Sequence, residues 1–158
     1  MNGEIRMKSY SSRKDVPEKY KWDLSFLFPN NDEWEKFYNK TDNQIEKLSL
    51  FQGKINNAKT LYDYLKLDSK ISVDIMDLYV YAMANSDEDL SNGDAITRLA
   101  KASDIENKYC ITVSFFEPEL LSLSKDDYNR LIDSSILKNY KSYLDKIYRF
   151  KDLVLTKE

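Results

Sequence analysis

Carboxylates supply most of the side chains in this sequence that could do chemistry. Residues 86–89 (SDED) place three of them at the end of a predicted helix, where oxygen ligands could hold Ca²⁺ or Mg²⁺. Their spacing does not match an EF-hand loop, so a solvated helix end is the simpler interpretation. Glu117 and Glu119 flank Pro118 and could form an acid–base pair if they converge. The alternative is a turn in which one of these acids caps a neighbouring helix.

The absence of histidine limits this chemistry most. The 158 residues contain no histidine and a single cysteine, Cys110, so zinc would have to be bound by one thiolate and carboxylates alone. Hydrolytic triads built on histidine are excluded. Cys110 lies among apolar residues of a predicted helix, which favours a small core residue over a reactive thiol. We therefore expect no catalytic, cofactor-binding or metal-binding residue in this chain.

Tyrosine is the other residue type with a possible functional role. Its apolar ring and polar tip suit peptide binding, although packing at helix interfaces is the simpler explanation for most of the tyrosines. The tyrosines that could line a peptide-binding cleft are Tyr79, Tyr81, Tyr109, Tyr140, Tyr143 and Tyr148.

The composition indicates an all-α protein. Only three glycines and three prolines occur in the chain, which favours long helices over a β-rich fold. Acidic and basic residues are interleaved and the net charge is −3, so we expect no nucleic-acid partner. No apolar run approaches the roughly 20 residues that a membrane span needs. With no signal peptide visible at the N-terminus, a cytoplasmic location is the expectation.

Hydrophobic periodicity predicts a single bundle-like helical domain over 16–158, after a flexible N-terminus over 1–15. Its first part, 16–30, is predicted to be an extended lead-in buried by Trp22, Leu24, Leu27 and Phe28. About five helices follow, over 31–50, 58–87, 93–115, 125–133 and 136–150. Pro118 should end or bend the third helix. Their predicted N-terminal caps include Asn30 or Asn31, Asn92 or Asp94, and Ser124.

The second predicted helix carries two apolar stripes, which would bury it on two sides as a central helix, with a possible break near 66–69. The first stripe is Leu61, Tyr64, Leu65, Ile71, Ile75, Leu78 and Ala82, and the second is Val73, Met76, Val80 and Met83. Glu106 falls on the apolar face of the next helix and is therefore a candidate buried acid.

Several segments in order resemble the N-terminal region of oligoendopeptidase F, a zinc peptidase of the thimet-oligopeptidase-like M3 family. The resemblance covers nearly the whole chain from Arg13 onward. Its motifs are Val16, Pro17, Tyr20, WDLS at 22–25, LFP at 27–29, Trp34, FQGKI at 51–55, LYVYA at 78–82, SDED at 86–89, FEPELL at 116–121, Tyr140, Tyr143, Leu144 and RFK at 149–151.

The resemblance implies a role that this chain alone does not complete. Enzymes of the family are several times longer, cut short peptides and bind zinc through an HEXXH helix, which a chain without histidine cannot contain. We therefore expect an N-terminal domain that forms a wall or lid of an oligopeptide cleft. Zinc and catalysis would belong to a missing C-terminal part, which is the expected partner. A stand-alone helical binding or homo-oligomerising module is the alternative, and the chain could be an expressed fragment, a truncated gene product or a remnant.

Overall fold

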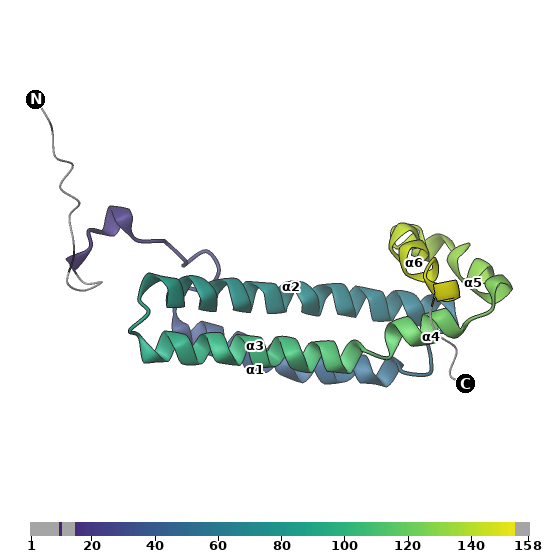
Figure 1. Ribbon diagram of the computed structural model, residues 1–158, viewed down its shortest axis with the longest axis horizontal. Helices are drawn as coiled ribbons and strands as arrows, with labels where there is room; N and C mark the ends of the chain where they lie inside the picture. Colours follow the sequence, from purple (N-terminus) through teal and green to yellow (C-terminus); the bar gives the residue numbers. More distant parts are fainter. Residues whose placement is uncertain (1–9, 11–14, 154–158) are drawn as a thin grey trace, which may run out of the picture.

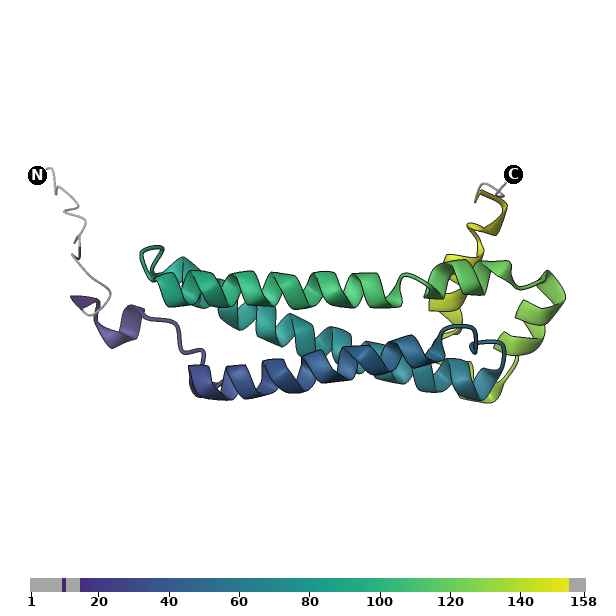
Figure 2. The ribbon, with the colours of Figure 1, turned by 90° about the horizontal axis from the view of Figure 1, so that it is seen from below.

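The computed structural model describes residues 10 and 15–153, and within them the protein is all-α, as predicted. Three long helices lie side by side, and three short ones gather at one end of them (Figures 1 and 2). The α-helices are α1 (Asn31–Ile45), α2 (Ala58–Glu88), α3 (Gly93–Val113), α4 (Phe116–Ser122), α5 (Lys125–Ile132) and α6 (Lys141–Tyr148). Short 3₁₀ segments cover Glu18–Tyr20, Glu46–Phe51, Ser135–Leu137 and Lys151–Leu153.

Polar caps begin the helices where the sequence predicted them. Asn30 accepts a hydrogen bond from the Glu33 N–H at the start of α1, and Ser124 accepts one from the Asp127 N–H at the start of α5. At the start of α3, Asn92 rather than Asp94 is the cap. These side chains satisfy backbone N–H groups that have no partner within the helix.

The helix bounds differ from the predicted ones at three places. The helix predicted over 31–50 is α-helical only to Ile45 and continues as a 3₁₀ segment, and that predicted over 136–150 is divided between Ser135–Leu137 and α6. Pro118 does not simply end α3. It lies in the first turn of a separate helix, α4, where proline is tolerated because the first N–H groups need no helical partner. The predicted flexible segment 1–15 lies almost wholly outside the described residues.

The centre of the bundle is built on α2, which packs against both α1 and α3. The Trp34 side chain of α1 is fully buried, and its indole N–H donates a hydrogen bond of 3.0 Å to the Leu78 carbonyl oxygen. The first predicted stripe of α2 is buried throughout, and no break interrupts the helix at 66–69. Phe28 of the lead-in is buried in the core, and Leu24 and Leu27 pack against it. Trp22, predicted to be buried, is instead 60% exposed.

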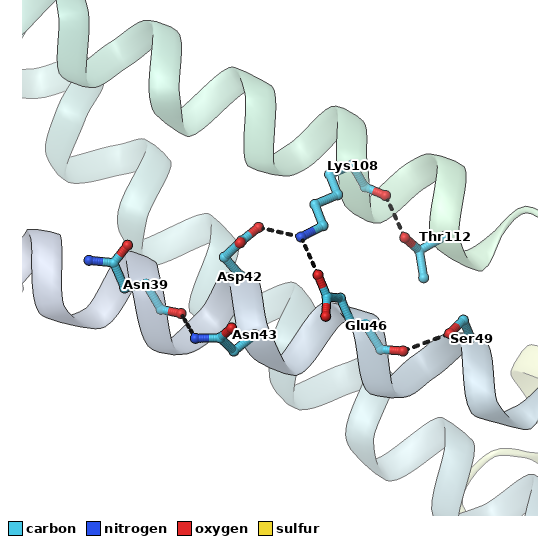
Figure 3. A network of polar contacts seen from close by, with 7 residues as sticks. All are labelled: Asn39, Asp42, Asn43, Glu46, Ser49, Lys108 and Thr112. Carbon is cyan, nitrogen blue, oxygen red and sulfur yellow. Dashed lines mark hydrogen bonds and ion pairs between the residues drawn. The ribbon is translucent and has the colours of Figure 1, made fainter.

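Two ion pairs show that α1 and α3 run parallel in a fixed register. Lys101 Nζ lies 2.9 Å from Glu35 Oε1, and Lys108 Nζ lies 2.8 Å from Asp42 Oδ1. In both pairs the lysine follows its acid by 66 residues. Lys108 also pairs with Glu46 Oε1 at 3.2 Å, so it bridges two turns of the first helix segment (Figure 3). We call these five residues the α1–α3 seam.

The second predicted stripe of α2 is not buried, which corrects the expectation of a helix covered on two sides. Val73 and Met76 are each 60% exposed and Met83 is 38% exposed. The reason is that α1 and α3 cover the opposite part of α2, and no other described helix lies over this stripe.

Candidate functional site

One side of the α2–α3 pair remains open to solvent and carries apolar and tyrosine side chains. Helical spacing places Ser72, Met76, Tyr79 and Met83 on one face of α2. Glu106 and Cys110 of α3 lie beside them and are exposed, so neither the buried acid nor the core cysteine predicted from the sequence is found. We call these six residues the α2–α3 face.

The first hollow in this face, the methionine hollow, has a volume of about 320 Å³. Its lining residues are Ser72, Ile75, Met76, Tyr79, Glu106, Tyr109 and Cys110. Methionine is a flexible, polarisable side chain that adapts to different apolar groups. The hollow is therefore suited to an apolar side chain of a ligand.

A second hollow adjoins the first, because Tyr109 lines both. Its volume is about 360 Å³, within the roughly 300–1,000 Å³ typical of ligand pockets. It lies where α2, α3, α4 and α6 meet, and we call it the tyrosine–carboxylate pocket. Its lining residues are Tyr64, Asp68, Tyr109, Val113, Ser114, Phe116, Glu117, Pro118 and Tyr143.

The break between α3 and α4 shapes this pocket. Because α3 ends at Val113 and α4 begins at Phe116, the chain turns and brings Phe116 against the end of α2. Phe116 stacks on Tyr64 with ring centroids 4.7 Å apart, and on its other side it lies parallel to Tyr143 of α6 at 6.5 Å. Stacked rings of this kind hold the tyrosines in defined positions.

Asp68 is the central polar group of the pocket. The Tyr109 hydroxyl donates a hydrogen bond of 2.7 Å to Asp68 Oδ1. Burial raises the pKa of the Asp68 carboxyl, and the hydrogen bond from Tyr109 opposes this rise only in part. Burial, followed by the hydrogen bond to Asp68 and its negative charge, raises the pKa of Tyr109, so the phenol stays protonated and keeps donating.

The pocket has a negative electrostatic environment. Burial and then the charges of Asp68 and Glu117 raise the pKa of Tyr143. Burial and, next, the Asp68 charge likewise raise the pKa of Tyr64. Carboxylates disfavour the ionisation of nearby phenols because like charges repel. The pocket thus presents two carboxylates and neutral tyrosine rings.

The two acids flanking Pro118 point to different places and form no acid–base pair. Glu117 lines the tyrosine–carboxylate pocket. Glu119 instead accepts hydrogen bonds from the backbone N–H groups of Gly53 at 2.8 Å and Ile55 at 3.2 Å. Gly53 has a φ of +75°, which glycine adopts without strain, so Glu119 fixes the turn that leads into α2.

The tyrosines considered for a cleft divide into two groups. Tyr79, Tyr109 and Tyr143 line the two hollows. The other three are packing residues: Tyr81 is buried and bonds Asn31, Tyr140 meets Tyr62 edge-on, and Tyr148 stacks on Tyr128 at 3.7 Å.

Residues 86–89 do not gather around a common point. The Trp22 backbone N–H donates to Glu88 Oε1, and Asp89 accepts from Ser91 in the turn before α3. No group of three or more Cys, Asp or Glu side chains that could hold a metal ion occurs in the described part of the chain.

The sequence identified Tyr64 only as a residue of the buried stripe, and Asp68 was not singled out at all. Their signal was present, since positions 64, 68, 71 and 75 follow the helical spacing of the buried stripe of α2. A carboxylate at such a position indicates either a partner or a cavity. The sequence-based interpretation of 66–69 as a possible break concealed that signal.

The chain is similar to bacterial oligopeptidases along nearly its whole length. The group B oligopeptidase PepB of Streptococcus agalactiae is 31% identical over 147 residues, which are 92% of this chain and 24% of that protein. Oligopeptidase PepF of Bacillus subtilis is 26% identical over 160 residues, covering 100% of this chain and 24% of the relative. A plasmid-encoded oligoendopeptidase F of Lactococcus lactis subsp. cremoris is 28% identical over 93% of this chain. No protein-family model matches the chain.

A solved structure has the same fold. A crystal structure from Chlamydophila abortus, described as that of a suspected peptidase, superposes with a TM-score of 0.83 over 91% of this chain and 25% of that one, at 24% sequence identity. The chain spans about a quarter of the length of the relatives that it matches. The resemblance to the N-terminal region of oligoendopeptidase F is thereby confirmed along nearly the whole chain.

Proposed function

We propose that this chain forms a wall of the oligopeptide cleft of an oligoendopeptidase F-like enzyme, with no peptidase activity of its own. The observation that carries the proposal is the uncovered α2–α3 face, whose methionine and tyrosine side chains and two adjoining hollows could contact an extended peptide. Similarity to oligopeptidases along nearly the whole chain supports the choice of a peptide as the ligand.

The catalytic zinc of such an enzyme would be bound elsewhere. The donor set of this chain does not fit zinc, because it has no histidine and its exposed Cys110 is not part of a group of possible metal ligands among the described residues. The proposal therefore assigns this chain no catalytic step. It includes a cytoplasmic location and a C-terminal partner that supplies the metal site.

A chimaera tests this proposal. The chain replaces the corresponding quarter of Bacillus subtilis PepF, and cleavage of a quenched fluorescent nonapeptide is measured alongside cleavage of a folded protein. We expect the chimaera to cut the nonapeptide only, and Met76→Arg to raise the KM because the charge obstructs the α2–α3 face. Lys47→Glu, an exposed change in the segment after α1, is the matched control.

Three results would overturn the proposal. The first is peptide cleavage by the 158-residue chain alone with added zinc. The second is equal KM values for the parent chimaera and the Met76→Arg variant when circular dichroism shows both to be folded. The third is a chimaera that folds but cuts the folded protein as readily as the nonapeptide.

Exposed apolar residues on α2 favour a second candidate, self-association of the chain. Val73 and Met76 are each 60% exposed on the same helix, and apolar surface of this kind often marks an interface. Sedimentation velocity separates the two possibilities. A dimer that Met76→Arg dissociates would support a stand-alone oligomerising module, whereas a monomer at high concentration would exclude it.

A further inference from the structure

Two carboxylates at the junction of α2, α3, α4 and α6 have no basic partner in the described structure. Asp68 accepts a hydrogen bond from the neutral Tyr109 hydroxyl, and no Lys or Arg nitrogen of the described residues lies within 4 Å of Asp68 or Glu117. Elsewhere α3 pairs its lysines with acids, as Lys101 does with Glu35. Of the two pocket carboxylates, Asp68 is partly buried and Glu117 is exposed. A partly buried carboxylate such as Asp68 is costly without a cation, so its environment favours a positive ligand.

Aromatic rings surround these carboxylates. Tyr64 and Phe116 are buried and stack on each other at 4.7 Å, whereas Tyr143 is 46% exposed and lies parallel to Phe116 at 6.5 Å. The open face of an aromatic ring attracts ammonium and guanidinium groups within about 6 Å, and Tyr143 is the ring of this stack that is accessible. Carboxylates and an accessible ring in one pocket of about 360 Å³ are the features that recognise an organic cation.

The adjoining methionine hollow indicates what kind of ligand would carry the positive group. The methionine hollow adjoins the pocket through Tyr109 and exposes Met76 and Tyr79, which suit an apolar group. A ligand that fills both hollows would carry a positive group and an apolar group a short distance apart. A peptide with a basic and an apolar side chain has this chemistry.

We propose that the tyrosine–carboxylate pocket binds the side chain of a lysine or arginine in a peptide, with Asp68 and Glu117 facing the charge and the exposed ring of Tyr143 facing the stem. An apolar side chain of the same peptide occupies the methionine hollow. The proposal concerns this chain by itself and does not depend on the cleft role.

Isothermal titration calorimetry of the full chain tests the proposal with two peptides that differ only in charge. The probes are the blocked peptide acetyl-Ala-Leu-Ala-Arg-Ala-Leu-Ala-amide and the same peptide with neutral citrulline in place of arginine. We expect the arginine peptide to bind between about three- and thirtyfold more tightly, from the contribution of a cation on aromatic rings. Agmatine serves as a third probe, and weaker binding of agmatine than of the peptide assigns part of the affinity to the methionine hollow.

Variants assign the binding to this pocket. Asp68→Asn keeps an acceptor for the Tyr109 hydroxyl but removes the charge, and it should weaken binding of the arginine peptide about tenfold. Asp104→Asn, which removes an exposed carboxylate of α3 on the side of Tyr38, should leave the affinity unchanged. Tyr143→Leu alters a ring that is 46% exposed, so the fold should tolerate it, and binding should fall about threefold or more.

Equal affinities for the arginine and citrulline peptides, or no binding of either, would overturn the proposal. It would equally be overturned if Asp68→Asn and Tyr143→Leu, both folded by circular dichroism, bound the arginine peptide as tightly as the unaltered chain. Agmatine bound as tightly as the arginine peptide would restrict the site to small free cations and contradict the peptide assignment.

Discussion

The two sides on which α3 meets its neighbours differ in how they treat charge and apolar surface. At the α1–α3 seam, the acids Glu35, Asp42 and Glu46 each lie within 3.2 Å of a lysine Nζ. Figure 3 shows the pairs that Asp42 and Glu46 make with Lys108. Along the α2–α3 face, Met76 stays exposed, and among the described residues Asp68 at its end is hydrogen-bonded only to Tyr109. The α1–α3 seam pairs its charged side chains within the chain. The α2–α3 face leaves apolar side chains exposed and a carboxylate without a basic partner among the described residues.

This difference separates the residues that hold the bundle together from those available to a ligand. Two ion pairs, separated by seven residues along each helix, fix the register of α1 and α3. The buried Trp34 anchors α1 to α2. The open side contributes little to that register. Changes on the paired or buried side should therefore affect stability, and changes at exposed residues of the open side should affect binding. The partly buried Asp68 should affect both.

The largest expected effect on stability is at Trp34. Trp34→Ala leaves a cavity and removes the hydrogen bond to the Leu78 carbonyl, so the free energy of unfolding should fall by about 3–5 kcal/mol. Met76→Ala on the open side should change it by less than about 0.5 kcal/mol. Urea unfolding followed by circular dichroism measures both. Similar losses for the two variants would contradict the distinction between the sides.

The next largest effect on stability is expected at Glu119, and Glu117 on the other side of Pro118 serves as the comparison. Glu119→Gln weakens two hydrogen bonds to the turn at Gly53 and Ile55, and it should lower the free energy of unfolding by about 1–2 kcal/mol. Glu117→Gln, which bonds no backbone group of the described chain, should change the stability by less than about 0.5 kcal/mol. A larger loss for Glu117→Gln in the same urea unfolding experiment would show that Glu117 has a structural role.

Asp68 should make the stability depend on pH in an unusual direction for an acid. Since burial raises the pKa of its carboxyl in the folded chain, Asp68 favours folding below its unfolded pKa, and this stability is lost as pH rises through the folded value. The Asp68→Asn variant should therefore become more stable relative to the unaltered chain as the pH rises from acid to neutral. The measurement is urea unfolding at a series of pH values, and a stability difference that does not vary with pH would contradict the assignment.

The smallest effect on the free energy of unfolding is expected at the α1–α3 seam. Lys108→Met removes pairs whose side chains are partly exposed, so it should cost at most about 1 kcal/mol, and less at high salt. Thermal unfolding in 50 mM and 1 M NaCl tests this. A loss that does not change with salt would indicate packing of the lysine stem rather than charge.

Local interactions made part of the fold predictable from the sequence. The caps Asn30 and Ser124 bond N–H groups only three residues away, so their spacing alone identified the helix starts. The buried stripe of α2 followed from helical periodicity. The break before α4 was placed only approximately, because proline is compatible with both the end and the first turn of a helix.

The candidate site was harder to predict because it depends on what covers each helix face. Periodicity shows that Met76 and Cys110 lie on apolar faces, but it cannot show that no helix packs over them. Asp68 meets Glu117 and Tyr143 only through the turn between α3 and α4 and the position of α6. Those are tertiary contacts between residues as many as 75 positions apart, and no local pattern encodes them.

Chemical-shift mapping by NMR tests the difference between the two sides most directly. The ¹⁵N-labelled chain is titrated with the arginine peptide, and backbone shifts are followed at every assigned residue. We expect the largest changes at Met76, Tyr79, Tyr109 and Tyr143, with none at Glu35 or Lys101. Changes centred on the α1–α3 seam, or no changes at saturating peptide, would contradict this expectation.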